Sequence, residues 1–347
     1  MSSGFLSFSV FLYVMLCLAI ESTAHTFAAS VVKEIDEDIT ILSSVRDMYT
    51  TEDGGLIPRE LSEHHLAVWK EVVSQALKKA EVSIQDIDLL AYSRAPGFGH
   101  ALRIGSGVVR CLASRYNIPV VGVNHCVAHL EIGRVLSGHS DPVLLYASGA
   151  NTQIIALEGG AYRVFGETLD LGVGNFLDTI ARFLGLGFPG GPAIERLAAS
   201  YEGELIELPY TVKGMDVSFS GLQTHLASMI DQKKFSPEAI AFATQEHVFA
   251  MLVEVAERAL AHTQKSSLVL GGGVGCNMRL QEMCRLMCEE LGVDFFAPEK
   301  QYLVDNAAMI GVLGLSVADR FGTLGVREVD FDAYERTDQA PVVVREF

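Results

Sequence analysis

The stretch LCLAIESTAHTFAASVV, residues 16 to 32, decides the fold class. It contains an apolar run, a short turn of Ser, Thr and His, and a second apolar run, which is the pattern of a β-hairpin. A related pattern returns at residues 143 to 168, where VLLYAS, TQIIALE and AYRVFGET are separated by a GAN turn and a Gly-Gly pair. The sequence therefore predicts strands at short spacing at the start of each half of the chain.

Strands and helices alternate after the first hairpin. Residues 64 to 80 carry apolar side chains at helical spacing and are expected to form an amphipathic helix. IDLLAY (87 to 92) and IPVVGV (118 to 123) have the composition of buried parallel strands. A helix between them, Gly105 to Tyr116, completes a βαβ unit.

The second half repeats this alternation. Ser236-Pro237-Glu238 begins a long helix that runs to about His262, and SLVL (267 to 270) is a strand. Residues 278 to 291 form a helix that Gly292 ends. The two halves together predict a duplicated α/β fold of two lobes with a ligand cleft between them.

The lobe boundary is placed at GHSDP, residues 138 to 142. The expected division is a first lobe of residues 15–139 plus 306–325, a second lobe of residues 140–305, an N-terminal extension of residues 1–14 and a C-terminal tail of residues 326–347. The apolar run at residues 5 to 20 has no Lys or Arg before it and no small-residue cleavage motif after it. We therefore expect a buried strand beginning at Met15, with no membrane anchor.

Composition limits the functional classes. The 347 residues are 49% hydrophobic and 20% charged, which is typical of an ordered globular enzyme. Lys and Arg total 26 against 43 Asp and Glu, so a net charge of −17 repels polyanions. A nucleic-acid substrate would need a local basic patch or a basic partner. The six cysteines form no CxxC pair, which fits a reducing cytoplasm.

Two histidines in NHCVAH suggest a metal site. His125 and His129 stand four residues apart just after a predicted strand, so a helix starting there places both imidazoles on one face. The zinc-protease motif HExxH is absent, because Cys126 occupies the position of its Glu. A metalloprotease is therefore disfavoured. An HxxxH pair alone is also compatible with two core or surface histidines.

Three glycine-rich stretches follow apolar segments: YASGANTQ (146 to 153), GFPGGPAIE (187 to 195) and LVLGGGVGCNMRL (268 to 280). Backbone N–H groups at such turns and at helix N-termini hold phosphates. The chain has no Walker lysine motif and no GxGxxG after its first strand, which argues against P-loop and Rossmann folds.

Three carboxylates are further candidates. Asp305 precedes a Gly/Ala-rich segment in an apolar run, where a charge is costly unless it is paired, capping or metal-bound. Asp178 lies on a predicted helix and is either a ligand-binding or a capping group. Glu195 follows PGGP and either accepts from a ribose hydroxyl or is an ordinary helix-start glutamate.

Together these motifs resemble a known family. IESTAHT, NHCVAH, YASGANTQ, GNFLDTIARFLGL, FPGGPAIERLA, KGMDVSFSGL, GGGVGCNMRL and DNAAMIG, in this order over residues 15 to 325, are similar to the tRNA N6-adenosine threonylcarbamoyltransferases, once described as O-sialoglycoprotein endopeptidases. The wording of ASGANTQ and MDVSFSGL resembles the archaeal and eukaryal branch, whose members are the catalytic subunits of KEOPS complexes.

The resemblance implies a fold and a set of site residues. The fold is the duplicated two-lobed type of actin, Hsp70 and the sugar kinases (ASKHA), with a nucleotide cleft between the lobes. One divalent metal ion, iron or zinc, is implied at His125, His129, Tyr146 and Asp305; two imidazoles suit either metal, and the phenolate leans toward iron. An adenine nucleotide, threonylcarbamoyl-AMP or ATP, is implied at Tyr146, Ala147, Ser148, Gly149, Ala150, Asp178, Gly191, Glu195 and Asn277.

The resemblance also implies a reaction and partners. A cytoplasmic acyltransferase of this family moves the threonylcarbamoyl group from threonylcarbamoyl-AMP to N6 of adenosine 37 in tRNAs that read codons beginning with A. Glu21 is our candidate for the general base. The expected partners are tRNA, a small kinase/ATPase and a small dimerising subunit.

Two other functions remain open at this point. A sugar or acetate kinase of the same fold would share the glycine loops and the cleft but would not need the His/His/Tyr/Asp set. A non-catalytic ATP-binding scaffold within a complex would not need His125 and Asp305. The metal and nucleotide content of the purified protein discriminates between these functions.

Overall fold

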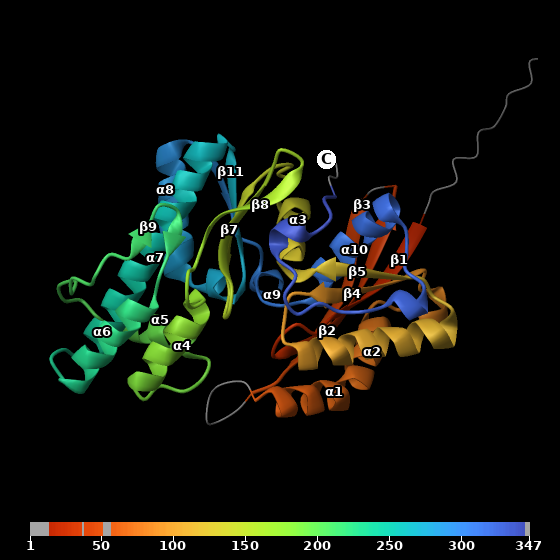
Figure 1. Cartoon of the computed structure of the whole chain (residues 1–347), viewed down its shortest axis with the longest axis horizontal. Coiled ribbons are helices and arrows are strands. Elements are labelled where there is room, and N and C mark those ends of the chain that lie inside the picture. The colour runs from red at the N-terminus through yellow and green to blue at the C-terminus, as the bar shows by residue number, and fades with distance from the viewer. Residues whose placement is uncertain (1–13, 37, 51–56, 344–347) are drawn as a thin grey trace, which may run out of the picture.

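The computed structural model describes residues 14–36, 38–50 and 57–343, and it consists of two lobes, each built on a five-stranded sheet (Figure 1). The first sheet has the order β3-β2-β1-β4-β5. Its strands are β1 (Val14–Glu21), β2 (Thr26–Ile35), β3 (Asp38–Met48), β4 (Leu89–Ala95) and β5 (Val120–Asn124). The pairs β1–β2 and β2–β3 are antiparallel, whereas β4 and β5 continue parallel to β1.

The second sheet repeats this topology. Its order is β12-β11-β6-β7-β8, with antiparallel pairs β6–β7 and β7–β8 and parallel pairs β6–β11 and β11–β12. The strands are β6 (Val143–Ala147), β7 (Thr152–Glu158), β8 (Ala161–Glu167), β11 (Ser267–Gly271) and β12 (Asp294–Phe296). The predicted duplicated α/β fold is confirmed. A small hairpin, β9 (Val212–Lys213) and β10 (Asp216–Val217), lies outside both sheets.

Sequence patterns located most of these strands but missed the two edge strands β3 and β12. The hairpin predicted at residues 16 to 32 is β1 and β2, and the three strands predicted after residue 143 are β6, β7 and β8. The strand β3 lies at the edge of its sheet and is only partly buried, so it lacks the continuous apolar run that marks β1. The first lobe therefore has the same three-stranded meander as the second.

Helices cover the outer face of each sheet (Figure 1). On the first sheet these are α1 (Pro58–Lys79) and α2 (Gly99–Tyr116), which share a core with β1 and β2. On the second they are α4 (Val173–Phe183), α5 (Gly190–Ala198), α6 (Ser220–Asp231), α7 (Pro237–Thr263) and α8 (Met278–Leu291). Among the described residues, only α7 is long and apolar enough to cross a membrane, and 72% of its most apolar stretch is buried inside the second lobe.

Local signals predicted some helix termini correctly and misplaced the starts of α1 and α2. Ser236 caps α7 by accepting from Ala239 N–H, and Gly292 ends α8 with a φ of 69°, both as predicted. Helix α1 starts at Pro58, six residues before the predicted start, because its first turn is polar and adds nothing to the apolar periodicity. Helix α2 likewise starts at Gly99 rather than Gly105.

Two helices lie between the sheets. Helix α3 (His125–Ser137) follows the last strand of the first sheet but packs closely against β11 of the second. Helix α10 (Ala307–Phe321) follows the second sheet and the short α9 (Lys300–Leu303) but packs against β1, β2 and β4. Both helices also contact each other and share one core. The two lobes are thus joined by an exchange of helices.

Glycine permits this close packing. A Cβ atom on Gly133 of α3 would lie 2.5 Å from the Val269 side chain, and one on Gly311 of α10 would lie 2.6 Å from Val32. Real Cβ atoms do not approach other atoms so closely, so a larger residue at either position would push a helix away from its sheet.

The C-terminal strap, residues 326 to 343, crosses both lobes. Tyr92 of β4 donates its hydroxyl hydrogen to the carbonyl of Asp330 at 2.6 Å. Tyr162 of β8 donates to the carbonyl of Val343 at 3.2 Å. The segment that the sequence suggested was a tail therefore contacts both sheets. The expected N-terminal extension, apart from Val14 in β1, lies outside the described residues.

A buried histidine provides a test of the packing of α1. His65 is fully buried, its Nε2 lies 3.0 Å from the carbonyl oxygen of Ala24, and its ring contacts Phe27 edge-on at 5.5 Å. Burial, followed by the charge of His64, lowers the pKa of His65 to about 4. The native structure therefore holds this imidazole neutral.

We expect stability to fall in mild acid because of His65. The unfolded chain binds a proton at this position near pH 6.5, whereas the folded chain does so only near pH 4. The free energy of unfolding should fall by roughly 3 kcal/mol between these pH values from this residue. The free energy of unfolding, measured with urea at pH 7.5 and 4.5, should change less with pH in His65→Gln than in the unmodified chain. His225→Gln, which changes an exposed histidine, is the control. Equal slopes for His65→Gln and the unmodified chain would contradict the prediction.

Candidate metal centre and active site

The site begins where β5 turns directly into α3. Asn124 is the N-cap of α3, and its side-chain oxygen accepts from the N–H groups of Cys126 at 3.0 Å and Val127 at 3.3 Å. His125 and His129 follow on one face of the helix, both buried, with ring centroids 4.9 Å apart. The predicted shared face is confirmed.

Four side chains from three distant segments meet at this face. His125 Nε2 lies 3.4 Å from Asp305 Oδ1, and His129 Nε2 lies 3.6 Å from the same oxygen. The hydroxyl of Tyr146, near the end of β6, lies 3.1 Å from His125 Nε2. The ligand atoms of His125, His129 and Asp305 all lie within 4.8 Å of one another. The cluster therefore sits at the junction of the lobes.

The donor atoms suit a metal ion. Both ring nitrogens of His129 are buried and have no hydrogen-bond partner within the described part of the chain, which is costly for a polar group. Tetrahedral ligands about 2.1 Å from an ion are roughly 3.4 Å apart, close to the spacing of Asp305 from each histidine. A metal ligand role gives His129 Nε2 the partner that it otherwise lacks.

Glu21, the last residue of β1, orients His125 from behind. Its Oε2 lies 2.9 Å from His125 Nδ1, and its Oε1 accepts from the N–H and the hydroxyl of Thr23, each at 2.6 Å. Glu21 is fully buried. A proton on Nδ1 shared with this carboxylate leaves the Nε2 lone pair facing Tyr146 and Asp305. The geometry favours an orienting role for Glu21 over the general-base role expected from the sequence.

The pKa values of the two histidines are shifted in opposite directions. Burial opposes the charged form of His125, but the carboxylate of Glu21, followed by Tyr146 and Asp305, raises its pKa well above the usual value. Burial likewise opposes the charge of Asp305, yet His125 holds the pKa of Asp305 well below its usual value. Burial lowers the pKa of His129, so this imidazole is neutral and its lone pair is available.

Burial holds the phenol of Tyr146 in its neutral form. Burial raises the pKa of its phenol far above the usual value, and the nearby charge of His125 only partly offsets this effect. The phenol therefore keeps its proton unless a cation lies beside it.

The residues expected to bind a nucleotide lie in two groups, of which the first adjoins the metal cluster. In the first, Ser148, Gly149 and Ala150 form the turn between β6 and β7, which begins right after Tyr146 and Ala147. The loop after β11 packs directly on this turn, because a Cβ atom on Gly272 would lie 2.3 Å from the carbonyl oxygen of Ala147. Two of the predicted glycine loops thus meet.

The second group consists of side chains that accept hydrogen bonds from N–H groups at the starts of α5 and α8. Asp178 Oδ1 accepts from Gly190 N–H at 2.7 Å, at the start of α5 beside Gly191. Glu195 Oε1 accepts from Met278 N–H at 2.8 Å, at the start of α8.

Asn277, the N-cap of α8, accepts from Arg279 N–H at 2.9 Å and donates to Gln245 at 3.1 Å. The N–H groups of Gly190 in α5 and of Met278 and Arg279 in α8 thus donate to side chains of the protein. From the sequence alone, we expected the N–H groups at such helix starts to be open to a phosphate. Together with Asp178 and Glu195, Asn277 places the caps of both helices in one region.

Sequence reasoning missed two residues of the site. Asn124 had a visible signal, since an Asn directly before a helix is a strong N-cap. Thr23, which donates to Glu21 and lies 3.2 Å from His125 Nδ1, had no such signal, because its role depends on a contact over 102 positions.

Comparison with known proteins identifies the family. The family model for tRNA N6-adenosine threonylcarbamoyltransferase matches residues 40–312. The chain belongs to this family. A tRNA N6-adenosine threonylcarbamoyltransferase of Thermococcus kodakarensis is 49% identical over 329 residues, covering 95% of this chain and 99% of that protein. One of Thermococcus gammatolerans is 51% identical over 301 residues, covering 87% of this chain and 91% of the relative.

Some relatives of the threonylcarbamoyltransferase family are longer. A probable bifunctional tRNA threonylcarbamoyladenosine biosynthesis protein of Methanothermobacter thermautotrophicus is 48% identical over 328 residues, which cover 94% of this chain but 60% of that protein. The rest of that protein is not matched by this chain.

Solved structures support the fold alone. HypF of Thermococcus kodakarensis superimposes with a TM-score of 0.60 at 14% identity, covering 88% of this chain and 48% of HypF. Component A of the (R)-2-hydroxyglutaryl-CoA dehydratase of Acidaminococcus fermentans gives 0.54 at 15% identity, covering 88% of this chain and 99% of component A. The threonylcarbamoyltransferase family thus shares its two-lobed architecture with proteins of very different sequence.

We expect His129→Ala and Asp305→Asn each to lower the bound metal well below one equivalent, because a site with three donors holds the ion weakly. Elemental analysis after dialysis checks the content, and circular dichroism checks the fold. Asp305→Asn keeps the side-chain volume and guards against misfolding, and His225→Ala on the surface of α6 is the control. Full occupancy in both site variants would refute the assignment of these ligands.

Proposed function

We propose that the chain transfers the threonylcarbamoyl group from threonylcarbamoyl-AMP to N6 of adenosine 37 in tRNAs that read codons beginning with A. The observation that carries this proposal is the meeting of His125, His129, Tyr146 and Asp305 at one point in a chain of this family. A kinase of the same architecture does not need such a cluster, and neither does a scaffold.

In the proposed reaction, the N6 amine forms a C–N bond with the carbamoyl carbon, the C–O bond to the phosphate breaks, and AMP leaves. The amine gives up one proton, which passes to solvent. The adenine lies in a single-stranded loop, so it can leave its stack at modest cost and enter the cleft.

His125, His129, Tyr146 and Asp305 are the residues that would hold the metal, with iron favoured over zinc by the phenol. When bound, a divalent ion supplies Lewis-acid polarisation of the carbonyl and neutralises charge on the leaving phosphate. Glu21 and Thr23 hold His125 in the orientation that this role needs. The buried walls around the histidines limit access of water to the reacting anhydride.

The nucleotide is assigned to the cleft beside this cluster. Tyr146, Ala147, Ser148, Gly149 and Ala150 line the turn nearest the metal residues. Asp178, Gly191, Glu195 and Asn277 are assigned to the ribose and base end, where their caps on α5 and α8 set the shape of the cleft. We also propose the lobe boundaries as residues 15–139 plus 306–325 and 140–305.

Partners are part of the proposal. With a net charge of −17 and no Lys/Arg-rich stretch, this chain offers few of the phosphate contacts that dominate affinity for RNA, so tRNA is expected to bind mainly through a KEOPS-type complex. Its expected members include a small kinase/ATPase and a small dimerising subunit. The existence of a longer bifunctional relative supports a second module that works beside this one. The proposed compartment is the cytoplasm.

A transfer assay tests the function. The reconstituted complex, given labelled threonylcarbamoyl-AMP, should label a tRNA with A37 and leave the same tRNA with G37 unlabelled. Asp305→Asn should reduce labelling by at least 100-fold, because the metal site is lost. Equal labelling by Asp305→Asn, or label on the G37 tRNA, would refute the proposal.

A salt series tests the partner requirement. The isolated chain should bind tRNA weakly, and the complex should bind it tightly with a steep loss of affinity as salt rises. Filter binding from 50 to 300 mM salt measures both. Tight, steeply salt-dependent binding by the chain alone would reveal a basic face that its composition does not suggest.

A further inference from the structure

We propose that Glu335 of the C-terminal strap is a positioning residue for the metal cluster, acting through the N-cap of α3. This inference rests on the proposed metal role of His125 and His129. Its starting observation is a contact over 211 positions, in which Asn124 Nδ2 donates to Glu335 Oε1 at 3.3 Å. Glu335 belongs to no motif by which the family was found.

Asn124 has two polar ends with different tasks. Its oxygen caps α3 by accepting from Cys126 and Val127, and its nitrogen points to the strap. The Asn124 side-chain amide can rotate by half a turn and exchange the positions of its oxygen and its nitrogen. Its NH₂ group would then point at the N–H groups of the helix, which cannot accept a hydrogen bond. A carboxylate only accepts hydrogen bonds, so Glu335 selects the orientation in which the oxygen caps α3.

Glu335 is itself held in place. Arg94, at the end of β4, binds the other carboxylate oxygen of Glu335 through Nη1 and binds Asp330 Oδ1 through Nε at 2.9 Å. The Glu335 side chain is only 14% exposed. A charged pair with two hydrogen bonds on the guanidinium fixes the carboxylate more firmly than a solvated glutamate. A continuous series of polar contacts therefore runs from β4 through the strap and Asn124 to α3.

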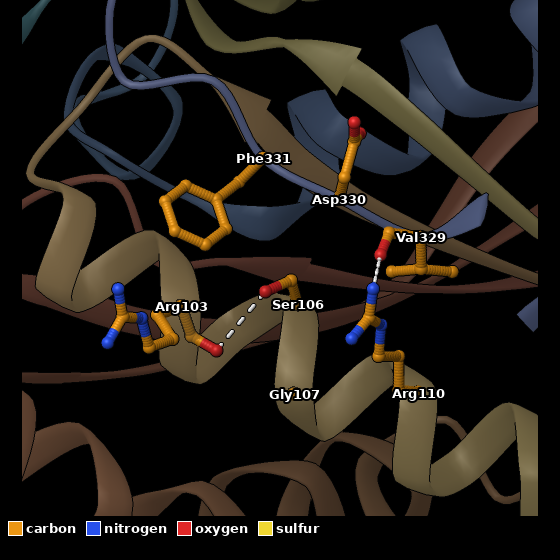
Figure 2. Close-up of a pocket in the computed structure, with 7 residues that line it drawn as sticks. All are labelled: Arg103, Ser106, Gly107, Arg110, Val329, Asp330 and Phe331. Atoms are coloured by element: carbon orange, nitrogen blue, oxygen red, sulfur yellow. Dashed lines mark hydrogen bonds between the residues drawn. The ribbon is translucent and has the colours of Figure 1, made fainter. Parts of the chain in front are cut away.

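The strap is anchored on both sides of Glu335. On the first lobe, Arg110 of α2 donates to the carbonyl of Val329, and the Arg103 guanidinium lies 6.0 Å from the centre of the Phe331 ring. Figure 2 shows these residues around a pocket of about 390 Å³ between α2 and the strap. The Phe331 ring in this view faces the side chain of Arg103.

On the second lobe, Thr337 Oγ1 lies 3.0 Å from Gln153 Oε1, and Arg336 Nη2 lies 3.4 Å from Glu167 Oε1. Glu335 thus stands at the point where the strap passes from one lobe to the other. Because its partner Asn124 directly precedes His125, a shift of the strap reaches the first metal residue through one side chain.

Hydrogen exchange of the metal-free chain separates this role from a general loss of stability. In Glu335→Ala the amides of Cys126 and Val127 should exchange about fivefold faster, the size expected for a lost N-cap, while amides in α7 keep their rates. Glu335→Gln retains an acceptor for Asn124 and should restore slow exchange. Arg336→Ala loosens the neighbouring strap contact with Glu167 and should leave both amides unchanged.

Cobalt binding provides the second readout. Glu335→Ala should weaken Co²⁺ binding about tenfold in competition with a chelator and alter the visible spectrum of the bound ion, as expected when support for a ligand is lost. Glu335→Gln should recover the wild-type spectrum. In Asn124→Ala, adding Glu335→Ala should cause no further loss, because both act through the same cap.

The outcomes distinguish the two proposals. If the unmodified chain binds no Co²⁺, the proposed metal function fails, and the exchange rates of the metal-free chain still decide the role of Glu335. Wild-type exchange and Co²⁺ affinity in Glu335→Ala would overturn the positioning role. Equal losses in Arg336→Ala and Glu335→Ala would also overturn it, because they would assign the effect to the strap as a whole.

Discussion

The exchange of α3 and α10 between the lobes is the constraint on which the rest of the structure depends. Each helix follows one sheet and packs on the other, so the core between the two sheets is shared by both lobes. The glycines at 133 and 311 allow the backbones to approach the sheets closely enough for this exchange. Because α3 carries the histidines and Asp305 precedes α10, the same packing assembles the metal cluster.

The junction of the lobes brings buried charged groups into contact. Glu21, His125 and Asp305 are brought together with little solvent, and a buried carboxylate or imidazolium is unfavourable without a partner. The mutual effects on the pKa values of His125 and Asp305 show that each stabilises the charged form of the other. A cation bound among these groups, as proposed, would replace a proton of His125 in balancing the carboxylates.

The sequence was informative where a signal is local. The duplicated strand pattern, the shared face of His125 and His129, and the end of α8 at Gly292 could all be predicted, since each depends on residues within a few positions. The edge strand β3 and the first turn of α1 escaped because partial exposure weakens apolar periodicity. The roles of Glu21, Thr23 and Glu335 required contacts across the fold, which no spacing in one sequence reveals.

The repeated sheet order has a consequence for the side chains that make up the site. In that repeat, α3 and α10 occupy equivalent places, each after the last strand of its own sheet. One copy contributes two imidazoles from its first helical turns, and the other contributes a carboxylate just before its helix. The site therefore lies where two topologically equivalent helices meet, yet its side chains are chemically different. Because both halves belong to one chain, their equivalent positions can carry different residues, which two identical subunits could not.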